Sequence, residues 1–399
     1  MAKMLYKNQT LFDWEPVKLG DEQCFEILGS GIDKFEEEKN YLSTSSIEKN
    51  RIKTPEGKIT YQERPSRANM QPRLNSVWFA RMKDTIKVYS FTEENKDEIS
   101  RYILSTGFAG ILCNANKVLP KYVEKIFLSK WFNNLKDALA SDKAIQKSLN
   151  NEDIVNIEIP LPPPSEQKKI VYVLDSIQDA IRAQEKIIEK TKELKKSMMV
   201  DLFKYGGPSF RKGRKLKKTE IGEIPENWEV VELGEIIETT SNINLKRKPN
   251  KKIKYIDVSS ISSEFLKIIE FKEYYGKNAP SRARKKIKTG DILFATVRPY
   301  LKRVAIVSNE FNEEICSTAF CIIRCKDNVI DRFFLFNYIS TNSFIDRVTF
   351  MQTGANYPAV SDKDLFIQKV PLPSPPEQRE IAEILQTIDQ KIEIEQKKK

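Results

Sequence analysis

The sequence predicts an α+β fold in which two duplicated mixed modules, related by a pseudo-two-fold, are separated by long antiparallel coiled-coil helices. Three observations lead to this prediction. A repeat runs through the chain, each copy mixes short apolar strand patterns with a shorter helix pattern, and each copy ends in a charged helix after a proline-rich junction. The length of 399 residues also exceeds what one compact core usually holds, which favours more than one domain.

The repeat consists of motifs that return in the same order at nearly the same spacing. The stretch from Trp14 to Gly20 returns from Trp228 to Gly234, which is 214 residues later. Further matching motifs lie 211 to 215 residues apart; they are Tyr41 and Tyr255, Pro65–Ala68 and Pro280–Ala283, Phe79-Ala80 and Phe294-Ala295, and Pro160–Pro162 and Pro371–Pro373. Unrelated domains of similar composition would not keep both order and spacing, so we interpret the chain as an internal duplication.

Each copy begins with a stretch of mixed pattern. In the second copy, the apolar runs Asp291–Ala295 and Ala319–Ile323 predict strands. Val329–Phe344 has apolar residues at helical spacing and predicts one helix. Strands and helices that do not alternate regularly are typical of an α+β module.

Two charged helices follow the mixed stretches. The first begins after Pro162-Pro163-Pro164 and ends before Gly206-Gly207-Pro208, and the second follows a capping box predicted at Ser374 to Glu377. Apolar residues form a stripe on each helix; those expected to pack between the helices are Ile170, Leu174, Ile177, Ile181 and Ile188 on the first, and Ile381, Leu385, Ile388 and Ile392 on the second. Antiparallel packing of one helix on the other would bury both stripes, and two independent surface helices are the alternative.

These elements divide the chain into four segments. We expect a first mixed module in residues 1–163, a central helix in 164–205, a second mixed module in 206–373 and a C-terminal helix in 374–399. The second helix is much shorter than the first, which predicts either a truncated chain or an asymmetric helix pair.

Composition favours a polyanionic partner and excludes several kinds of chemistry. Lys and Arg total 67 against 56 Asp and Glu, which gives a net charge of +11. There is no histidine, which excludes Ser-His-Asp hydrolysis and every histidine-ligated metal site. Neither a Gly-x-x-x-x-Gly-Lys loop nor a Gly-x-Gly-x-x-Gly turn occurs. We therefore expect a non-catalytic chain with no cofactor and no metal of its own.

The sequence also bears on location and on the cysteines. No apolar run is long enough for a membrane span and the first residues lack a signal peptide, so we expect a cytoplasmic protein that does not contact a membrane. Five cysteines, an odd number, do not predict a disulfide framework. Cys316, Cys321 and Cys325 fall on a predicted strand, and we interpret them as small buried side chains, not as zinc ligands.

Four segments resemble a known family. They are Lys217–Trp228, Thr289–Phe294, and the junctions Ile159–Pro162 and Val370–Pro373, which are followed by Glu166-Gln167 and Glu377-Gln378. On these motifs the chain resembles the DNA-specificity subunit of type I restriction-modification systems over nearly its whole length. The junction motif occurs twice at the repeat spacing, which makes it the most specific part of the resemblance.

The resemblance implies a non-enzymatic subunit in which each module is a target recognition domain that reads one half of a bipartite site in double-stranded DNA. The two helices would be spacers that set the gap between the half-sites. They would also dock two methyltransferase subunits, which carry S-adenosylmethionine, and restriction subunits with motor and nuclease activity would join that complex. The first module departs from the family pattern, because Arg73-Leu74-Asn75-Ser76 stands in place of the turn Thr289-Gly290-Asp291.

Basic residues around the strand at 291–295 are the first candidates for DNA contact, because cations neutralise phosphates and a few reach base edges. These candidates are Arg282, Arg284, Lys285, Lys286, Arg298, Lys302 and Arg303, with Tyr300 among them, and the aligned residues of the first module are Arg67, Arg73, Arg81 and Lys83. Arg298 stands out because the fork of an arginine matches guanine. The alternative is an ordinary solvated charge run.

A polar loop at 351–358 is the second candidate. Gln352 and Asn356 carry amides suited to adenine, Tyr357 lies beside them, and an ordinary polar turn is the alternative. The aligned stretch of the first module has Lys143 and Gln146, which predicts a different half-site. The basic run at 211–218 is interpreted as mobile linker charge that follows phosphates, and a solvated linker is the alternative.

Two other functions remain open at this point. One is a duplicated DNA-binding regulator that works alone, and the other is a coiled-coil scaffold without sequence readout. A methyltransferase gene beside this one, or sequence-specific DNA retention that requires the methyltransferase, would argue against both.

Overall fold

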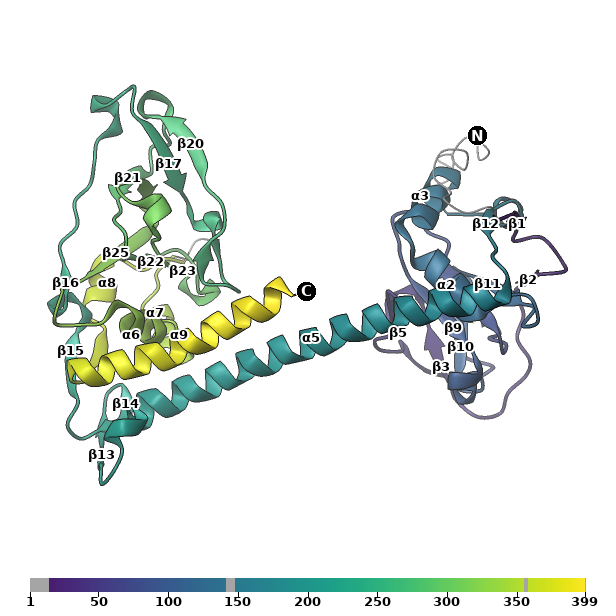
Figure 1. Ribbon diagram of the computed structural model, residues 1–399, viewed down its shortest axis with the longest axis horizontal. Helices are drawn as coiled ribbons and strands as arrows, with labels where there is room; N and C mark the ends of the chain where they lie inside the picture. The colour runs from purple at the N-terminus through teal and green to yellow at the C-terminus, as the bar shows by residue number, and fades with distance from the viewer. Residues whose placement is uncertain (1–13, 141–147, 355–357, 399) are drawn as a thin grey trace. The chain divides into compact units, whose positions relative to one another are not determined.

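The computed structural model describes residues 14–140, 148–354 and 358–398. The chain forms two compact units that divide within a long helix, so that the first ends at Ala180 and the second starts at Ile181. Each unit contains one of the two mixed modules expected from the sequence (Figure 1).

The first unit contains two four-stranded sheets. One has the order β6-β3-β10-β7, formed by Gly57–Ile59, Lys39–Leu42, Tyr102–Ser105 and Ala68–Met70. The other has the order β2-β11-β8-β9, formed by Phe25–Leu28, Phe108–Cys113, Ser76–Ala80 and Val88–Phe91. Short pairs join β1 (Pro16–Lys18) to β12 (Glu158–Pro160) and β4 (Ile47–Glu48) to β5 (Arg51–Ile52).

The second unit repeats this topology strand for strand. Its sheets have the orders β20-β17-β24-β21 (Lys272–Tyr275, Lys252–Ile256, Ile315–Ser317, Ala283–Lys286) and β16-β25-β22-β23 (Ile237–Glu238, Phe320–Cys325, Ile292–Ala295, Val304–Ile306). The short pairs are β15 (Glu229–Glu232) with β26 (Lys369–Leu372), and β18 (Ile261–Ser262) with β19 (Lys267–Ile268). Even the parallel pairing recurs, between β3 and β10 and between β17 and β24. The duplication predicted from the sequence is therefore confirmed.

The sheet that contains β8 is buried on both faces, as its uninterrupted apolar run favours. In the first unit, Val77 and Phe79 pack under the helices α2 (Pro120–Leu128) and α3 (Lys130–Leu139), whereas Trp78 and Ala80 face the core shared with the other sheet. The second unit uses the same alternation along β22. Each unit thus has three layers, one of helices and two of sheet.

The single helix predicted at 329–344 is wrong, because the structure has two helices there, α6 (Arg332–Ile339) and α7 (Asn342–Phe350). The break has a local cause. The Thr341 hydroxyl accepts the Phe344 N–H at 3.3 Å and starts a new helix as its N-cap. Two short helices complete the layers, α4 (Asn151–Val155) in the first unit and α8 (Asp362–Phe366) in the second.

The turn that the first module was expected to lack is present. Asn75 adopts a left-handed conformation with φ 64°, as Gly290 does with φ 88°. The Ser76 hydroxyl accepts the Arg73 N–H at 3.3 Å, which is the contact that Asp291 makes with Lys288 N–H at 2.7 Å. Asparagine tolerates this conformation better than most residues, so the same turn forms with different side chains.

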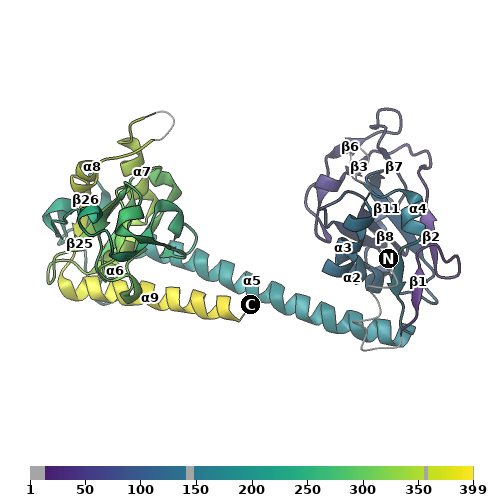
Figure 2. The same cartoon turned by 90° about the horizontal axis from the view of Figure 1, so that it is seen from above.

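The two long helices are α5 (Pro164–Tyr205), with 42 residues, and α9 (Pro375–Lys397), with 23 residues. Within the second unit they run antiparallel, and Figures 1 and 2 both show α9 alongside the later half of α5. Gln184 Nε2 donates to a Glu395 carboxylate oxygen at 2.6 Å, and Lys195 Nζ lies 2.7 Å from both Asp389 carboxylate oxygens. Rising numbers on α5 meet falling numbers on α9, which confirms the predicted antiparallel pair.

The apolar stripe residues of the two long helices fall into three groups, which are packed on the helices, packed on a module core, or exposed. The first group is Ile188 and Ile392, which are buried, with Ile181 and Ile388, which are half-buried. In the second group, Ile381 and Leu385 belong to the core of the second unit, and Ile170 packs on the core of the first. Leu174 and Ile177 are 41% and 53% exposed, so for these two the predicted helix packing is wrong. The register explains this, because Glu395, close to the end of α9, already lies at Gln184.

Across the residues that the structure describes, no helix is both long enough and apolar enough to cross a membrane.

Candidate nucleic-acid interface

The first turn of each long helix is attached to its module by a buried glutamine. In the first unit, Gln167 Oε1 accepts the Leu119 N–H at 2.7 Å. Its Nε2 donates to the carbonyl oxygens of Lys117 at 2.9 Å and Pro162 at 2.8 Å. The side chain is fully buried and its hydrogen-bonding groups are paired, as a buried amide requires.

Gln378 makes the same contacts at the start of α9. Its Oε1 accepts the Asp331 N–H at 2.6 Å, and its Nε2 donates to Val329 O at 3.1 Å and Pro373 O at 2.8 Å. The glutamines of the repeated junction motif therefore have a structural role, which is to fix the start of each long helix against its own module.

The glutamates of the junction motif meet the tryptophans of the other repeated motif. Trp14 Nε1 donates to Glu166 at 2.9 Å, and Trp228 Nε1 donates to Glu377 at 3.0 Å. Glu377 is fully buried and also accepts from Arg214, with Nη2 at 3.0 Å from Oε2. Trp14 and Glu166 are 152 residues apart in the sequence, and Trp228 and Glu377 are 149 apart. In each unit, two distant motifs therefore meet at this tryptophan–glutamate contact.

The capping box predicted at Ser374 is wrong. The Ser374 side chain makes no cap hydrogen bond, although Ser374 is the N-cap residue of α9. The Glu377 carboxylate is already bound to Trp228 and Arg214, so it does not return to the backbone of Ser374.

Two loops that the sequence selected separately lie side by side in the second unit. The Arg298 N–H donates to Pro358 O at 2.8 Å, and Val297 forms a bridge with Ala359. Ala359 in turn exchanges two backbone hydrogen bonds with Thr353, at 2.9 and 3.0 Å. The loop at 298–303 and the polar loop that begins at Gln352 therefore form one surface; Asn356 and Tyr357 lie outside the described residues.

The first of these loops has a strained backbone. Arg298 and Lys302 both have φ 51°, on either side of the short turn Pro299–Leu301. Residues other than glycine avoid this region, and each such residue costs about 1–3 kcal/mol, which is typical of functional sites. Within the turn, Tyr300 and Leu301 are 47% and 40% exposed, and the Arg298 side chain is exposed too.

Several candidate cations are exposed and point away from the cores. Arg67, Arg282 and Arg284 are exposed, although Arg284 Nε also donates to Ser281 O at 2.8 Å. Others form surface ion pairs; they are Arg73 with Glu26 and Lys286 with Glu313. Such pairs contribute little stability, so both cations remain able to exchange their partner for a phosphate.

Three candidate cations are used inside their modules instead. Lys285 Nζ is held by Asp362 at 2.6 Å and by Phe320 O at 2.7 Å. Arg303 Nη1 donates to two carbonyl oxygens of the 258–261 turn, at 2.7 and 3.0 Å. Arg81 donates to Asn151 at 2.7 Å and to Phe108 O at 3.1 Å, and burial lowers the pKa of its guanidinium. We therefore assign these three side chains to stability and remove them from the DNA candidates.

The remaining candidate DNA-contact residues differ in their exposure and contacts. Lys83 is half-buried. Lys302 contacts the Asn342 side chain at the start of α7. Gln352 is half-buried, and its buried Oε1 has no hydrogen-bond partner within the described part of the chain. Lys143 and Gln146 lie outside the described residues.

The basic run at 211–218 is not the mobile linker that the sequence suggested. Arg211 pairs with Asp201, Arg214 pairs with Glu377, and Leu216–Thr219 forms the strand β13 paired with β14 (Gly222–Pro225). Lys212 and Lys215 are exposed on this folded segment. The counterpart of this hairpin in the first module would fall within residues 1–13, which the structure does not describe.

Four of the five cysteines are buried, Cys325 is half-buried, and all five are free thiols. Burial raises the pKa of Cys113 and Cys325 to about 12, and it also raises the pKa of Cys316 and Cys321. Thiols with a raised pKa are poor nucleophiles at neutral pH. Within the described ranges, no three or more Cys, Asp or Glu side chains gather in a way that could hold a metal ion.

Comparison with known proteins identifies the family. The family model for the type I restriction modification DNA specificity domain matches residues 12–193 and 225–399. The chain belongs to this family. Both matched segments contain one mixed module and at least the start of one long helix, so the family domain is present twice.

Curated relatives in this specificity family include two specificity subunits of Methanocaldococcus jannaschii. The chain is 32% identical over 293 residues to the putative type I restriction enzyme MjaX specificity subunit of Methanocaldococcus jannaschii, which covers 72% of this chain and 65% of that protein. It is 33% identical over 252 residues to the MjaVIII specificity subunit of the same organism, covering 61% and 58%. The matched regions therefore span less than two thirds of these relatives.

Solved structures of similar fold include two chains from type I systems. One was determined in a study of complex assembly and conformational transition of the type I R-M system; it is 20% identical with a TM-score of 0.61, covering 97% of this chain and 93% of that one. The other is the S subunit from M. genitalium, 14% identical with a TM-score of 0.52, covering 98% and 93%. At these identities the likeness concerns the fold alone.

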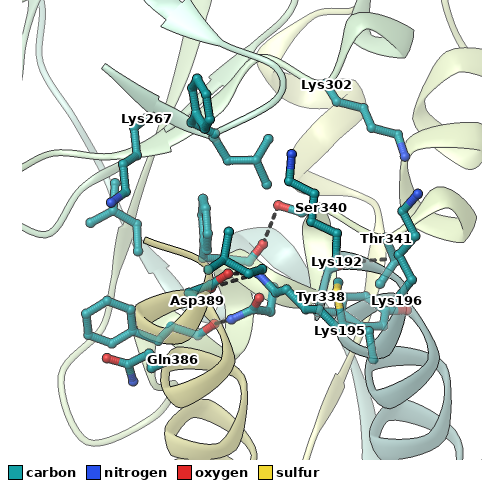
Figure 3. Close-up of a pocket in the computed structure, with 18 of the residues that line it drawn as sticks. Lys192, Lys195, Lys196, Lys267, Lys302, Tyr338, Ser340, Thr341, Gln386 and Asp389 are labelled. Carbon is teal, nitrogen blue, oxygen red and sulfur yellow. Dashed lines mark hydrogen bonds and ion pairs between the residues drawn. The ribbon is translucent and has the colours of Figure 1, made fainter. Parts of the chain in front are cut away.

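The second unit also contains a large cavity, and several lysines that line it form ion pairs within the unit. It has a volume of about 1440 Å³ and lies between α5, α9, α6 and the β18–β19 hairpin (Figure 3). Lys195 pairs with Asp389 on α9, Lys192 pairs with Glu264 of the hairpin at 2.7 Å, and Lys267 pairs with Glu393. These lysines hold the hairpin and the helices together, so we do not count them as DNA contacts.

Proposed function

We propose that this chain is the DNA-specificity subunit of a type I restriction-modification complex. In this proposal each module reads one half of a bipartite site in double-stranded DNA. The chain catalyses no reaction itself, and methylation and cleavage belong to partner subunits that act with it on DNA in the cytoplasm.

One observation carries the proposal, namely that two modules of identical topology are each attached to a long helix by the same Trp–Glu–Gln contacts. A protein that reads two separate half-sites needs two reading modules, and the separation of the modules must be rigid for the gap to be constant. The exposed loop at Arg298 and Tyr300 supplies a cation and an aromatic ring where a base edge or a phosphate would be met.

Family membership supports a proposal about the partners as well. We propose that the helix pair docks two methyltransferase subunits, which carry S-adenosylmethionine, and that restriction subunits join this complex. The alternative functions are a DNA-binding regulator that works alone and a scaffold without sequence readout, and the methylation test below distinguishes them from the proposed one.

The test is to map DNA methylation in the host genome with and without this gene. We expect one gapped, bipartite motif to lose its methylation when the gene is deleted and to regain it on complementation. Unchanged methylation in the deletion strain would argue for a regulator or a scaffold instead.

A module exchange then tests bipartite reading. Residues 209–373 are replaced with the equivalent segment of another specificity subunit. One half of the methylated motif should change while the other half and the activity stay. A change in both halves, or in neither, would contradict separate reading by each module.

A further inference from the structure

Phe350 is the most exposed large apolar side chain among those the structure describes, at 92% of its surface. It is the last residue of α7, whose buried face is made by Phe344, Ile345 and Val348. The opposite face carries Asn342, Ser343 and Asp346, all polar and exposed. A phenylalanine on the polar face of a helix breaks the pattern that folding alone would favour, and such departures are typical of functional positions.

The backbone around Phe350 is ordered by contacts on both sides. The Met351 N–H donates to Val348 O at 3.1 Å and the Gln352 N–H donates to Thr349 O at 3.1 Å. Thr353 then pairs with Ala359 in the ladder that reaches the Arg298 loop. The backbone that carries the ring is therefore held in a defined position, which a side chain that enters another molecule requires.

Two unpaired polar atoms lie within two residues of this ring. Thr349 Oγ1 and Gln352 Oε1 are both buried and have no hydrogen-bond partner among the residues that the structure describes. Buried polar atoms are nearly always paired, so this end of α7 departs from the hydrogen bonding typical of a segment that serves folding alone.

The same surface continues onto the strained loop. α7 packs against the turn Pro299–Leu301, where Tyr300 and Leu301 are exposed. Arg298 and Lys302 flank this turn and supply positive charge. Apolar rings between cations suit a nucleic acid, because the cations meet phosphates while the rings meet base faces.

We propose that Phe350 is a wedge that inserts between two stacked base pairs of the second half-site. This inference rests on the proposed function. Proteins that insert an apolar side chain at a base step unstack it and kink the duplex, which makes the choice of that step part of the specificity. In the first module the counterpart helix α3 ends in Ala138-Leu139 and has no phenylalanine at its end, so we assign the wedge to the second half-site alone.

The test uses the full chain in complex with its methyltransferase partner and a duplex that carries the methylated motif mapped in the host genome. 2-Aminopurine replaces one base at a time across each half-site, because its fluorescence rises when it is unstacked. With the wild type we expect a rise at one step of the second half-site. Phe350→Ala should abolish this rise and weaken binding roughly tenfold, whereas Phe350→Leu should retain much of both.

Phe265→Ala is the matched control, because Phe265 is another exposed phenylalanine of the same unit but lies at the cavity in Figure 3. It should leave the fluorescence unchanged, and the thermal midpoints of all variants should agree, since neither ring is part of a core. If Phe350→Ala keeps the rise and binds within twofold of the wild type, the wedge is refuted while sequence-specific binding stands. If the wild-type complex does not prefer its motif over a scrambled duplex, the proposed function fails as well.

Discussion

Gln167 and Gln378 lie 211 residues apart in the chain and make the same hydrogen bonds. Each amide accepts from the N-cap residue of one module helix, Leu119 of α2 or Asp331 of α6, and donates to the proline-rich junction that precedes its own long helix. The direction in which a long helix leaves its module is therefore set by one buried side chain. This relationship makes the helix pair a candidate for a rigid spacer.

The first prediction concerns that glutamine. Gln378→Leu leaves the Asp331 N–H and two carbonyl oxygens without partners, so we expect the second unit to lose at least about 2 kcal/mol of unfolding free energy. Hydrogen exchange of peptides that cover 329–335 measures this loss. Gln386→Leu on the same helix is the control, because Gln386 is half-buried and makes only one long bond to Ala382 O, and it should change stability by less than about 0.5 kcal/mol.

The second prediction concerns the buried ion pair of Arg214 and Glu377. Arg214→Met leaves a buried carboxylate without its cation, which should cost about 3–5 kcal/mol. Arg211→Met removes an ion pair with Asp201, whose side chain is 40% exposed. This substitution should lower the free energy of unfolding by no more than about 1 kcal/mol. Adding Glu377→Gln to Arg214→Met should restore part of the loss. Equal effects of the two single changes in denaturant unfolding would contradict this assignment.

The third prediction concerns pH. Hydrogen bonds from Gln184, and then from Lys391 and Lys398, lower the pKa of Glu395 to about 2 from its usual value of 4.5. A lowered folded-state pKa stabilises the folded protein above the unfolded-state pKa, and this contribution disappears as pH falls towards 2. The wild type should therefore be more stable than Glu395→Gln at pH 6, and the difference should shrink between pH 4.5 and pH 2. Thermal unfolding across this range checks it, and a constant difference would be the contrary result.

The fourth prediction concerns base reading by Arg298. Arg298→Ala should weaken binding by about 1–3 kcal/mol and relax one position of the second half-site, because the fork of an arginine specifies guanine. The first half-site serves as the internal control. Lys215→Ala, on the exposed basic segment, should instead weaken binding to all sequences alike and flatten the salt dependence. If Arg298→Ala also weakens every sequence equally, Arg298 positions the DNA and does not read it.

The fifth prediction treats α5 as the element that sets the gap. Four residues inserted next to Gln178 lengthen the helix by about 6 Å and nearly keep its phase, so the gap in the methylated motif should grow by up to about two base pairs. This position is preferable to one near Lys190, because Gln184 and Lys195 hold α9 in register. Two inserted residues rotate the helix by roughly 200° and should abolish methylation. A gap that stays the same in an active four-residue variant would rule out this role for α5.

Much of this organisation follows from the sequence alone. The repeat spacing, the proline-rich junctions and the apolar stripes are local or periodic signals, so they identify the duplication, the helix bounds near Pro164 and Tyr205, and the antiparallel helix pair. The Trp14 and Trp228 motifs were visible as repeats, but their contact with the junction glutamates depends on residues far apart in the chain.

Only the tertiary structure decided how the candidate side chains are used. Arg298 and Lys285 are both cations near the strand β22, yet Arg298 is exposed on a strained loop and Lys285 is half-buried and paired with Asp362. Composition and spacing cannot separate them, because exposure depends on which distant segment packs above each side chain. The same holds for Asn75, which forms the turn of Gly290 without its glycine, and for Phe350, whose ring is left exposed by the way α7 packs. The sequence by itself determined that there are two modules and two long helices, and long-range packing determined which residues of those modules remain available to a partner.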